Sequence, residues 1–351
     1  MRKVGIAVAG AGLIGLRHIE EIRKSGSATL AAIVDVAPKA ASLARDAGVP
    51  LYGSLAELLA AGRPDGVILA TPNQLHVEQA LACIAADVPV LIEKPVASAF
   101  ADGVRLCETA ERARSRVLVG HHRRHSPILH KAVEIVRSGV LGTIVGVMGS
   151  AVFYKPDADG YYDGANAWRR APGGGPILLN MIHEIGNLRA MVGEIVAVQA
   201  FASNATRGFE VEDTAAINLR FANGALGSFL LSDTGASPKS WEQTSQENKA
   251  YPAYDDEDAY TLVGTHGSLG VPTMRLRYYK NEAERSWFKP FTTRTETVAR
   301  TDPLASQIEH FAAVIRGEAE PLVTCRDGLA NLRVTEAIAE AARTGRIVAT
   351  A

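Results

Sequence analysis

Three glycines in the spacing G-x-G-x-x-G follow a short apolar run at the start of the chain and precede a helix-like segment. The run is Val4–Ala9, and the motif comprises Gly10, Gly12, Leu13, Ile14 and Gly15. Glycines in this spacing allow a tight turn and let a pyrophosphate approach the backbone, while the helix N-terminus offers N–H groups to the anion. The motif therefore predicts a strand–turn–helix unit that binds a dinucleotide.

An acidic residue stands where such a unit would need one. Asp35 ends the second apolar run, 20 residues after Gly15, where a carboxylate would bind a ribose hydroxyl. The carboxylate would repel a 2′-phosphate, and neither Val36 nor Ala37 supplies a compensating cation. The motif favours NAD over NADP. The alternative is a tight βα turn with an incidental Asp35.

The first 121 residues alternate between short apolar runs and amphipathic stretches. Strands so short and so uniformly apolar are typical of a parallel sheet that is buried on both faces. Alternation with helices predicts a doubly wound sheet, which binds ligands beyond the carboxyl ends of its strands. We expect residues 1–121 to form this α/β domain. The further runs are Leu30–Val34, Val67–Ala70, Pro89–Ile92 and Val117–Val119.

From residue 122 the pattern changes to strands that follow one another directly. They predict a second α/β domain, residues 122–351, with a large, mostly antiparallel open sheet and helices on one face. Its last two helices can pack back on the first domain. Residues 155–176 and 233–258 are expected to be long loops. The expected strands are Gly142–Phe153, Ile195–Phe201, Thr214–Phe221, Ala225–Ser232, Ala259–Val263 and Leu269–Pro272, and the expected helices are His125–Gly139, Ile177–Met191, Leu304–Arg316 and Asp327–Arg343.

Charge and cysteine content exclude several classes of protein. Among 351 residues the formal net charge is −1, which gives no general attraction to nucleic acid or to an anionic membrane. No apolar run is long enough for a transmembrane span. Cys83, Cys107 and Cys325 are an odd number without metal-ligand spacing. They argue against a disulfide framework or a metal site and predict a reducing, cytoplasmic location.

A polar cluster follows the third long strand. Thr71, Pro72 and Asn73 stand at its end, and His76 follows three residues after Asn73. Pro72 would turn the chain off the sheet and leave its neighbours at the carboxyl edge, beside the dinucleotide. The alternative interpretation is that Asn73 simply caps the next helix.

The next strand is followed by Glu93, Lys94 and Pro95. A lysine at this edge, beside a nicotinamide cation, would have its pKa lowered toward neutrality by desolvation and by that charge. Such a group can exchange a proton with a substrate hydroxyl. Pro95 can fix the local backbone through a cis bond. The alternative is a solvated surface lysine in a turn.

A glycine-rich run precedes another polar pair. Asn180 and His183 follow Gly173–Pro176 and share one helix face because they are three residues apart. Histidine is the usual proton shuttle near neutral pH. The glycines indicate close approach of a ligand or of another backbone segment. A purely structural histidine remains the alternative.

Together these motifs resemble the Gfo/Idh/MocA family of oxidoreductases over nearly the whole chain. The resemblance extends to Val211-Glu212-Asp213-Thr214 and to Gly264–Leu269. It implies an N-terminal Rossmann domain, a C-terminal domain with an open sheet, and a homodimer or homotetramer formed through that sheet.

The same resemblance implies roles for individual residues. Lys94 would be the catalytic lysine, and His183 would be the catalytic histidine. Glu93 and Asn73 would contact the cofactor, as would the neighbouring Thr71, Pro72 and His76. His122 would face nicotinamide and substrate, and the pair Trp168 and Arg169 would approach the cofactor from the second domain.

The chain departs from the family pattern at two positions. Relatives often have an aspartate four residues before the histidine and another three residues after it, where this chain has Leu179 and Gly186. Asn180 would take the place of the first aspartate and position a hydroxyl by neutral hydrogen bonds.

The resulting hypothesis is an NAD-dependent dehydrogenase that acts on a secondary alcohol of a sugar, cyclitol or related polyol, without a metal. Lys94 and His183 would move the proton, and Lys94, His122, Asn180 and His183 would contact the substrate. One alternative is an NAD-using glycosidase, which would hydrolyse its substrate with no net change in NADH. Another is a non-catalytic NAD-responsive binding protein, which would be expected to lack Lys94 or His183.

Overall fold

The computed structural model describes residues 2–157 and 160–350, and it forms two compact units. The first unit comprises Met1–His125 and Pro303–Leu332, and the second comprises Ser126–Asp302 and Arg333–Ala351. Each unit has its own apolar core. The division into domains at residues 121 and 122 stays a prediction.

The first unit is built on a six-stranded sheet in the order β3-β2-β1-β4-β5-β6, with every pairing parallel. This confirms the doubly wound sheet predicted from the apolar runs. Strand β3 was not predicted because two residues carry no periodicity. The strands are β1 Val4–Ala9, β2 Ala28–Val34, β3 Leu51–Tyr52, β4 Gly66–Leu69, β5 Val90–Glu93 and β6 Val117–Gly120.

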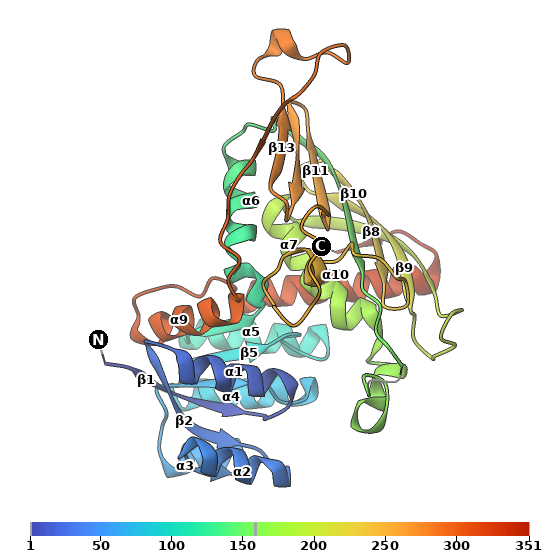
Figure 1. The fold of residues 1–351 in the computed structure, drawn as a ribbon. Coiled ribbons are helices and arrows are strands. Elements are labelled where there is room, and N and C mark those ends of the chain that lie inside the picture. The colour runs from blue at the N-terminus through green and yellow to red at the C-terminus, as the bar shows by residue number, and fades with distance from the viewer. Residues whose placement is uncertain (1, 158–159, 351) are drawn as a thin grey trace. The chain divides into compact units, whose positions relative to one another are not determined.

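Helices α1 to α5 alternate with these strands, and α9 joins the same unit from the far end of the sequence (Figure 1). Helix α9 buries Ile308 and Phe311 in the first core. It packs so closely that a side chain on Gly66 would meet Phe311. The helices are α1 Leu13–Lys24, α2 Pro38–Ala47, α3 Leu55–Ala61, α4 His76–Ala85, α5 Phe100–Ala113 and α9 Pro303–Arg316.

The second unit is built on a nine-stranded sheet in the order β14-β13-β12-β11-β7-β10-β9-β8-β15 (Figure 1). The pairing is antiparallel except between β7 and β10. This confirms the mostly antiparallel sheet. The strands are β7 Ile144–Val152, β8 Ile195–Ser203, β9 Thr214–Phe221, β10 Leu226–Ser232, β11 Tyr260–Gly264, β12 Gly267–Val271, β13 Arg275–Tyr278, β14 Thr292–Thr295 and β15 Val348–Ala349.

Several boundaries in the second unit differ from the sequence prediction. The helix expected from His125 begins at Pro127, because the Ser126 hydroxyl accepts hydrogen bonds from the N–H groups of Ile128 and Leu129. The expected loop 233–258 contains a short helix that buries Trp241. The helices are α6 Pro127–Arg137, α7 Ile182–Met191, α8 Trp241–Thr244 and α10 Cys325–Thr344. A 3₁₀ helix lies at Gly164–Arg170, and a π-helical turn at Ile177–Met181 leads into α7.

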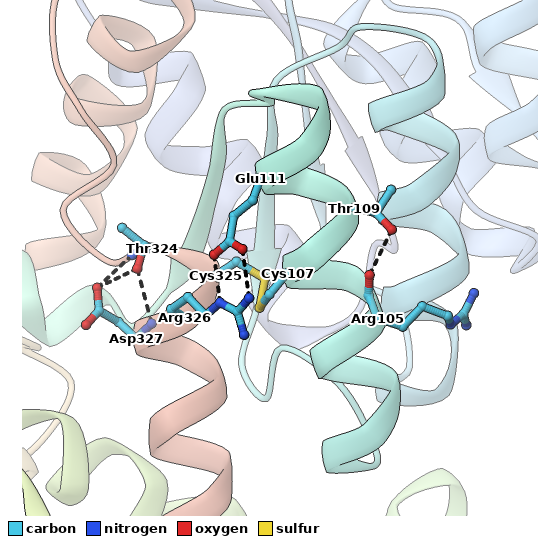
Figure 2. The surroundings of a disulfide bond; sticks show 8 residues. All are labelled: Arg105, Cys107, Thr109, Glu111, Thr324, Cys325, Arg326 and Asp327. Carbon is cyan, nitrogen blue, oxygen red and sulfur yellow. Dashed lines mark hydrogen bonds and ion pairs between the residues drawn. A yellow bond between two sulfur atoms is a disulfide. The ribbon is translucent and has the colours of Figure 1, made fainter.

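A disulfide corrects the expectation drawn from the cysteine count. Cys107 on α5 is bonded to Cys325, the first residue of α10, with 5.4 Å between their Cα atoms (Figure 2). Arg326 next to it forms a two-point ion pair with Glu111 of α5. The sulfur atoms are 218 residues apart in sequence, so only the tertiary fold brings them together. Cys83 is buried with a free thiol.

Helix α10 contributes to both cores, Leu329 and Leu332 to the first and Ala337 and Ile338 to the second. No helix in the described ranges has the length and apolar character needed to cross a membrane.

Candidate functional site

The three glycines of the first loop are required for different reasons. Gly10 has φ +91°, and a side chain there would collide with the backbone at Ala70. A side chain on Gly15 would collide with the carbonyl of Gly10. Gly12 has open space where a side chain would stand. Two glycines therefore close the turn, and the third leaves the backbone accessible to a ligand.

The N-terminus of α1 is suited to an anion. Gly12 is its N-cap and supplies no side-chain hydrogen bond, and the first turn carries no acidic residue. Its first N–H groups and the helix dipole thus face the open side of the glycine loop. This arrangement fits the pyrophosphate of a dinucleotide.

Asp35 lies directly after β2 and braces the glycine loop. One carboxylate oxygen accepts the Ala11 N–H at 2.6 Å, and the other accepts the Ala37 N–H at 2.7 Å. Asp35 is half-buried. The position of Asp35 after β2 fits a ribose contact, and that contact stays a prediction. The two hydrogen bonds that Asp35 makes in the structure stabilise the glycine loop.

The Thr71-Pro72-Asn73 segment leaves the carboxyl end of β4. The Thr71 hydroxyl donates to Gln79 Oε1 at 2.6 Å, which ties the segment to α4. The alternative role of Asn73 as a helix cap is wrong. Asn73 is itself the first residue of a short turn, and the N-cap of α4 is Leu75, which makes no side-chain capping bond.

His76 is held inside the protein by two backbone carbonyls. Its ring is fully buried, with Nδ1 2.8 Å from the Pro95 carbonyl and Nε2 3.0 Å from the Thr71 carbonyl. Burial lowers its pKa, which outweighs the opposite effect of the two carbonyl contacts. The buried ring ties Thr71 to Pro95, and the cofactor contact expected of His76 stays a prediction.

Glu93 is also occupied within the protein. The residue is 4% exposed, and its Oε1 is 2.7 Å from Nε2 of His18 on α1. Its Oε2 accepts the Lys94 N–H at 3.2 Å. This pairing leaves little carboxylate surface for the predicted ribose contact. The carboxylate links α1 to the backbone that carries Lys94.

Lys94 follows the last residue of β5 and is half-buried. The Lys94–Pro95 peptide bond is cis, as the sequence suggested. The two buried histidines hold the residues on either side of it, His18 through Glu93 and His76 through Pro95. His122, beyond β6, has a pKa well below its ordinary value because of burial and because of the charges on Arg123 and Lys94.

In the second unit, Asn180 and His183 lie on consecutive turns, one in the turn Ile177–Met181 and one in α7. The carboxylate of Glu212 accepts the N–H of Ile177, the first residue of the segment Ile177–Met181, at 2.8 Å. Burial raises the pKa of Glu212. Gly175, at φ +79°, leaves the space for this carboxylate, since its Cβ would be 2.6 Å from Glu212 Oε1. The glycine run therefore admits another segment of the protein.

A basic and aromatic cluster surrounds Asn180. The ammonium of Lys155 donates to Asn180 Oδ1 at 2.5 Å and to the Tyr161 hydroxyl at 3.0 Å. The Arg169 guanidinium lies over the Tyr161 ring, 4.0 Å from its centroid. Trp168 is 48% exposed. Asn180 is thus held by a positive charge that the motif analysis did not identify.

A small pocket opens beside this cluster. Its polar lining comprises Lys155, Asn180, Glu184, Ser232, Asp233 and Glu242. His183 does not line it. Among residues 2–157 and 160–350, no group of His, Cys, Asp and Glu is arranged to hold a metal ion.

The structure places the predicted residues in two separate sets. The first unit holds the glycine loop, Asp35, Asn73, Lys94 and His122, and the second holds Trp168, Arg169, Asn180 and His183. Sequence reasoning missed His18, and it named Glu212 only as part of a family motif, without a role. A signal existed for His18, which stands four residues before Ile22 on the buried face of α1 and so needs a polar partner.

Comparison with known proteins agrees with this architecture. A family model described as an oxidoreductase family with an NAD-binding Rossmann fold matches residues 4–121, and the GFO/IDH/MocA C-terminal domain matches residues 129–270. The rhizopine catabolism protein MocA of Rhizobium meliloti is 26% identical, over 97% of this chain and 95% of its own. An inositol 2-dehydrogenase of Rubrobacter xylanophilus is 27% identical, over 98% and 92%.

Solved structures show the same fold. The WlbA dehydrogenase from Bordetella pertussis, in complex with NADH and UDP-GlcNAcA, superimposes with a TM-score of 0.78 at 28% identity. The match covers 99% of each chain.

Proposed function

The chain belongs to the GFO/IDH/MocA family of NAD-binding oxidoreductases, and from this premise we propose how it acts on its substrate. It is an oxidoreductase of the sugar and polyol dehydrogenase type, acting on CH–OH groups. The proposed reaction interconverts a secondary alcohol and a ketone of a sugar, cyclitol or related polyol. The named relatives support this class of substrate, since one is an inositol dehydrogenase.

The glycine loop and α1 would hold the pyrophosphate, and Asp35 and Asn73 would hold the ribose and nicotinamide ends. The open space at Gly12 and the uncapped start of α1 support this assignment. A bound nicotinamide supplies the hydride acceptor or donor at the substrate carbon. Asp35 makes NAD the expected cofactor, because a second negative charge would repel a 2′-phosphate.

The single observation that carries the proposal is the position of Lys94. It follows β5 at the carboxyl edge of the sheet, the same edge as the glycine loop after β1. Ligands of such sheets bind beyond this edge. In the oxidation direction, the substrate carbon loses a hydride and its hydroxyl loses a proton, which passes to the neutral amine of Lys94 or to His183. Asn180 would hold the substrate oxygen.

The test is NAD reduction by purified protein with myo-inositol, D-glucose, 1,5-anhydro-D-glucitol and D-gluconate, and NADH oxidation with 1,5-anhydro-D-fructose. The expected result is turnover of at least one of these compounds. Lys94→Ala should lower kcat by at least about 100-fold, the usual size of general acid–base catalysis. NAD affinity should stay within about threefold, and Lys24→Ala, a surface variant on α1, should match the wild type.

Equal activity of Lys94→Ala and the wild type would contradict the role of Lys94. Hydrolysis of a glycoside with no net NADH would favour an NAD-using glycosidase instead. Ligand affinity without turnover of any compound would favour a binding protein.

We also propose that a second copy of this chain covers the outer face of the nine-stranded sheet. Side chains on β10 alternate between the core and solvent, and several exposed side chains on β7, β8 and β10 are large and apolar. These are Val145, Met148, Phe201, Leu226 and Leu230. Several large apolar side chains exposed on one sheet are typical of an interface.

A further inference from the structure

Lys155 is fixed in place before its side chain begins. Its N–H donates to the Asp233 carbonyl at 2.8 Å, and its own carbonyl accepts from Arg207 at 2.6 Å. Arg207 also donates to the Asp233 carbonyl at 2.7 Å. The residue is 7% exposed. Lys155 is therefore an anchored part of the pocket wall.

The ammonium of Lys155 has two neutral oxygen partners. It donates to Asn180 Oδ1 and to the Tyr161 hydroxyl, and it lies 4.6 Å from the centroid of the Tyr161 ring. Arg169 covers the same ring and donates to the Tyr161 carbonyl at 2.9 Å. Arg169 therefore restrains the position of Tyr161, in addition to the hydrogen bond from Lys155.

The contact determines which way round the Asn180 carboxamide lies. An ammonium group has donors and no acceptor, so only the amide oxygen can face it. The NH₂ group must then point away from Lys155. We propose that Lys155 is a positioning residue that presents the Asn180 NH₂ group to the pocket as a hydrogen-bond donor to a substrate oxygen. This inference rests on the proposed function.

The charges around the pocket indicate which substrate group fits. Besides Lys155, the ionisable groups lining it are the carboxylates of Glu184, Asp233 and Glu242. Arg207 pairs with Asp233 at 3.2 Å, so Lys155 and Arg207 face three carboxylates and the balance stays negative. This balance disfavours an anionic group, so the matching partner of Asn180 is an uncharged hydroxyl or carbonyl oxygen. An aspartate at position 180 would pair with Lys155 and would offer no hydrogen. The donor role thus gives a reason for an amide at this position.

The first test compares Asn180→Asp with the wild type, using the compound of the panel above that gives the fastest turnover. Loss of the donor should lower kcat by about 100-fold, the usual cost of removing one preorganised donor. NAD affinity should be unchanged. Lys131→Met, a surface variant on α6, serves as the control and should match the wild type. If Asn180→Asp keeps kcat within about threefold of the wild type, the donor role is overturned.

The second test is the pH profile of the double variant Lys155→Met/Asn180→Asp. The charged groups around position 180 are then the carboxylates of Glu184, Asp233 and Glu242, with Arg207 paired to Asp233 and Arg169 over the Tyr161 ring. Burial and the carboxylates should raise the pKa of the new carboxyl once the ammonium is gone, so lowering the pH supplies a proton that can be donated. The activity ratio of the double variant to Asn180→Asp should therefore rise as the pH falls from 8 to 5. A ratio that does not change with pH would overturn the proposal, because a merely structural lysine predicts no such rise.

A third measurement needs no substrate. The unfolding temperatures of the wild type, both single variants and the double variant form a double-mutant cycle for the Lys155–Asn180 contact. We expect Asn180→Asp to be tolerated beside Lys155 and to lower the unfolding temperature when Lys155 is Met. Additive changes would overturn the contact. If the wild type turns over no compound of the panel, the proposed function fails, while this cycle still decides on the contact.

Discussion

At the scale of single residues, the contacts around Lys94 are the most informative feature of the first unit. Its neighbours Glu93 and Pro95 are each bound by a buried histidine from a different helix. Both histidines fix the backbone that carries Lys94, and they do so without contacting a ligand. Preorganisation of this kind is what the proposed proton transfer by Lys94 would require.

The His18–Glu93 pair yields a prediction about stability. His18→Leu keeps most of the volume and removes the donor to Oε1 of the buried Glu93 carboxylate. Loss of this contact should lower the free energy of unfolding by about 3 kcal/mol. His18→Gln keeps an N–H donor and should lower the free energy of unfolding by about half as much. Urea denaturation measures both variants. Equal losses for Leu and Gln would show that the hydrogen bond contributes nothing.

His76 yields a prediction about pH. Burial lowers its pKa in the folded state below the ordinary value of 6.5, so the fold favours the neutral ring. The associated stability is present above pH 6.5 and is lost as the pH falls below that value. The unfolding temperature should therefore fall between pH 7 and pH 5, and less steeply in His76→Gln. Parallel curves for the two proteins would contradict this assignment.

At the scale of elements, the disulfide between α5 and α10 joins segments that the sequence keeps far apart. Figure 2 shows it beside the Arg326–Glu111 ion pair, so two contacts hold the first turn of α10 against α5. The ion pair is exposed and contributes little by itself. The covalent bond is the stronger of the two constraints.

Reduction should therefore lower stability. The disulfide closes a loop of 218 residues, so its reduction should lower the free energy of unfolding by up to about 5 kcal/mol if the effect comes from the entropy of the unfolded chain. The unfolding temperature should fall on addition of dithiothreitol, and Cys325→Ala should show the reduced value with or without it. Cys83→Ala is the control, and it should still respond to the reductant. An unchanged unfolding temperature in dithiothreitol would show that the bond does not stabilise the fold.

At the scale of the whole molecule, the exposed apolar face of the nine-stranded sheet predicts self-association. Leu230→Glu combined with Met148→Glu places two charges on this face and should shift the mass measured by light scattering from an oligomer toward the monomer. Lys131→Glu, on α6, is the control and should leave the mass unchanged. A monomeric wild type would refute the proposed interface.

The sequence by itself determined the architecture of the two sheets and the position of the glycine loop. Short apolar runs separated by amphipathic stretches specify a buried parallel sheet. The glycine spacing marks the turn after β1, where Gly10 and Gly15 have no room for a side chain. The cis bond before Pro95 was also within reach of local reasoning. These features depend on neighbours in the chain, so periodicity and motif spacing reveal them.

The tertiary structure alone decided which polar groups are paired. His18 meets Glu93, Lys155 meets Asn180, and Cys107 meets Cys325 across separations that no periodicity encodes. For the same reason His76, predicted to contact the cofactor, is a buried link between two carbonyls. A buried donor, acceptor or charge must find a partner, but the chain does not state which one, and only packing of the elements supplies it.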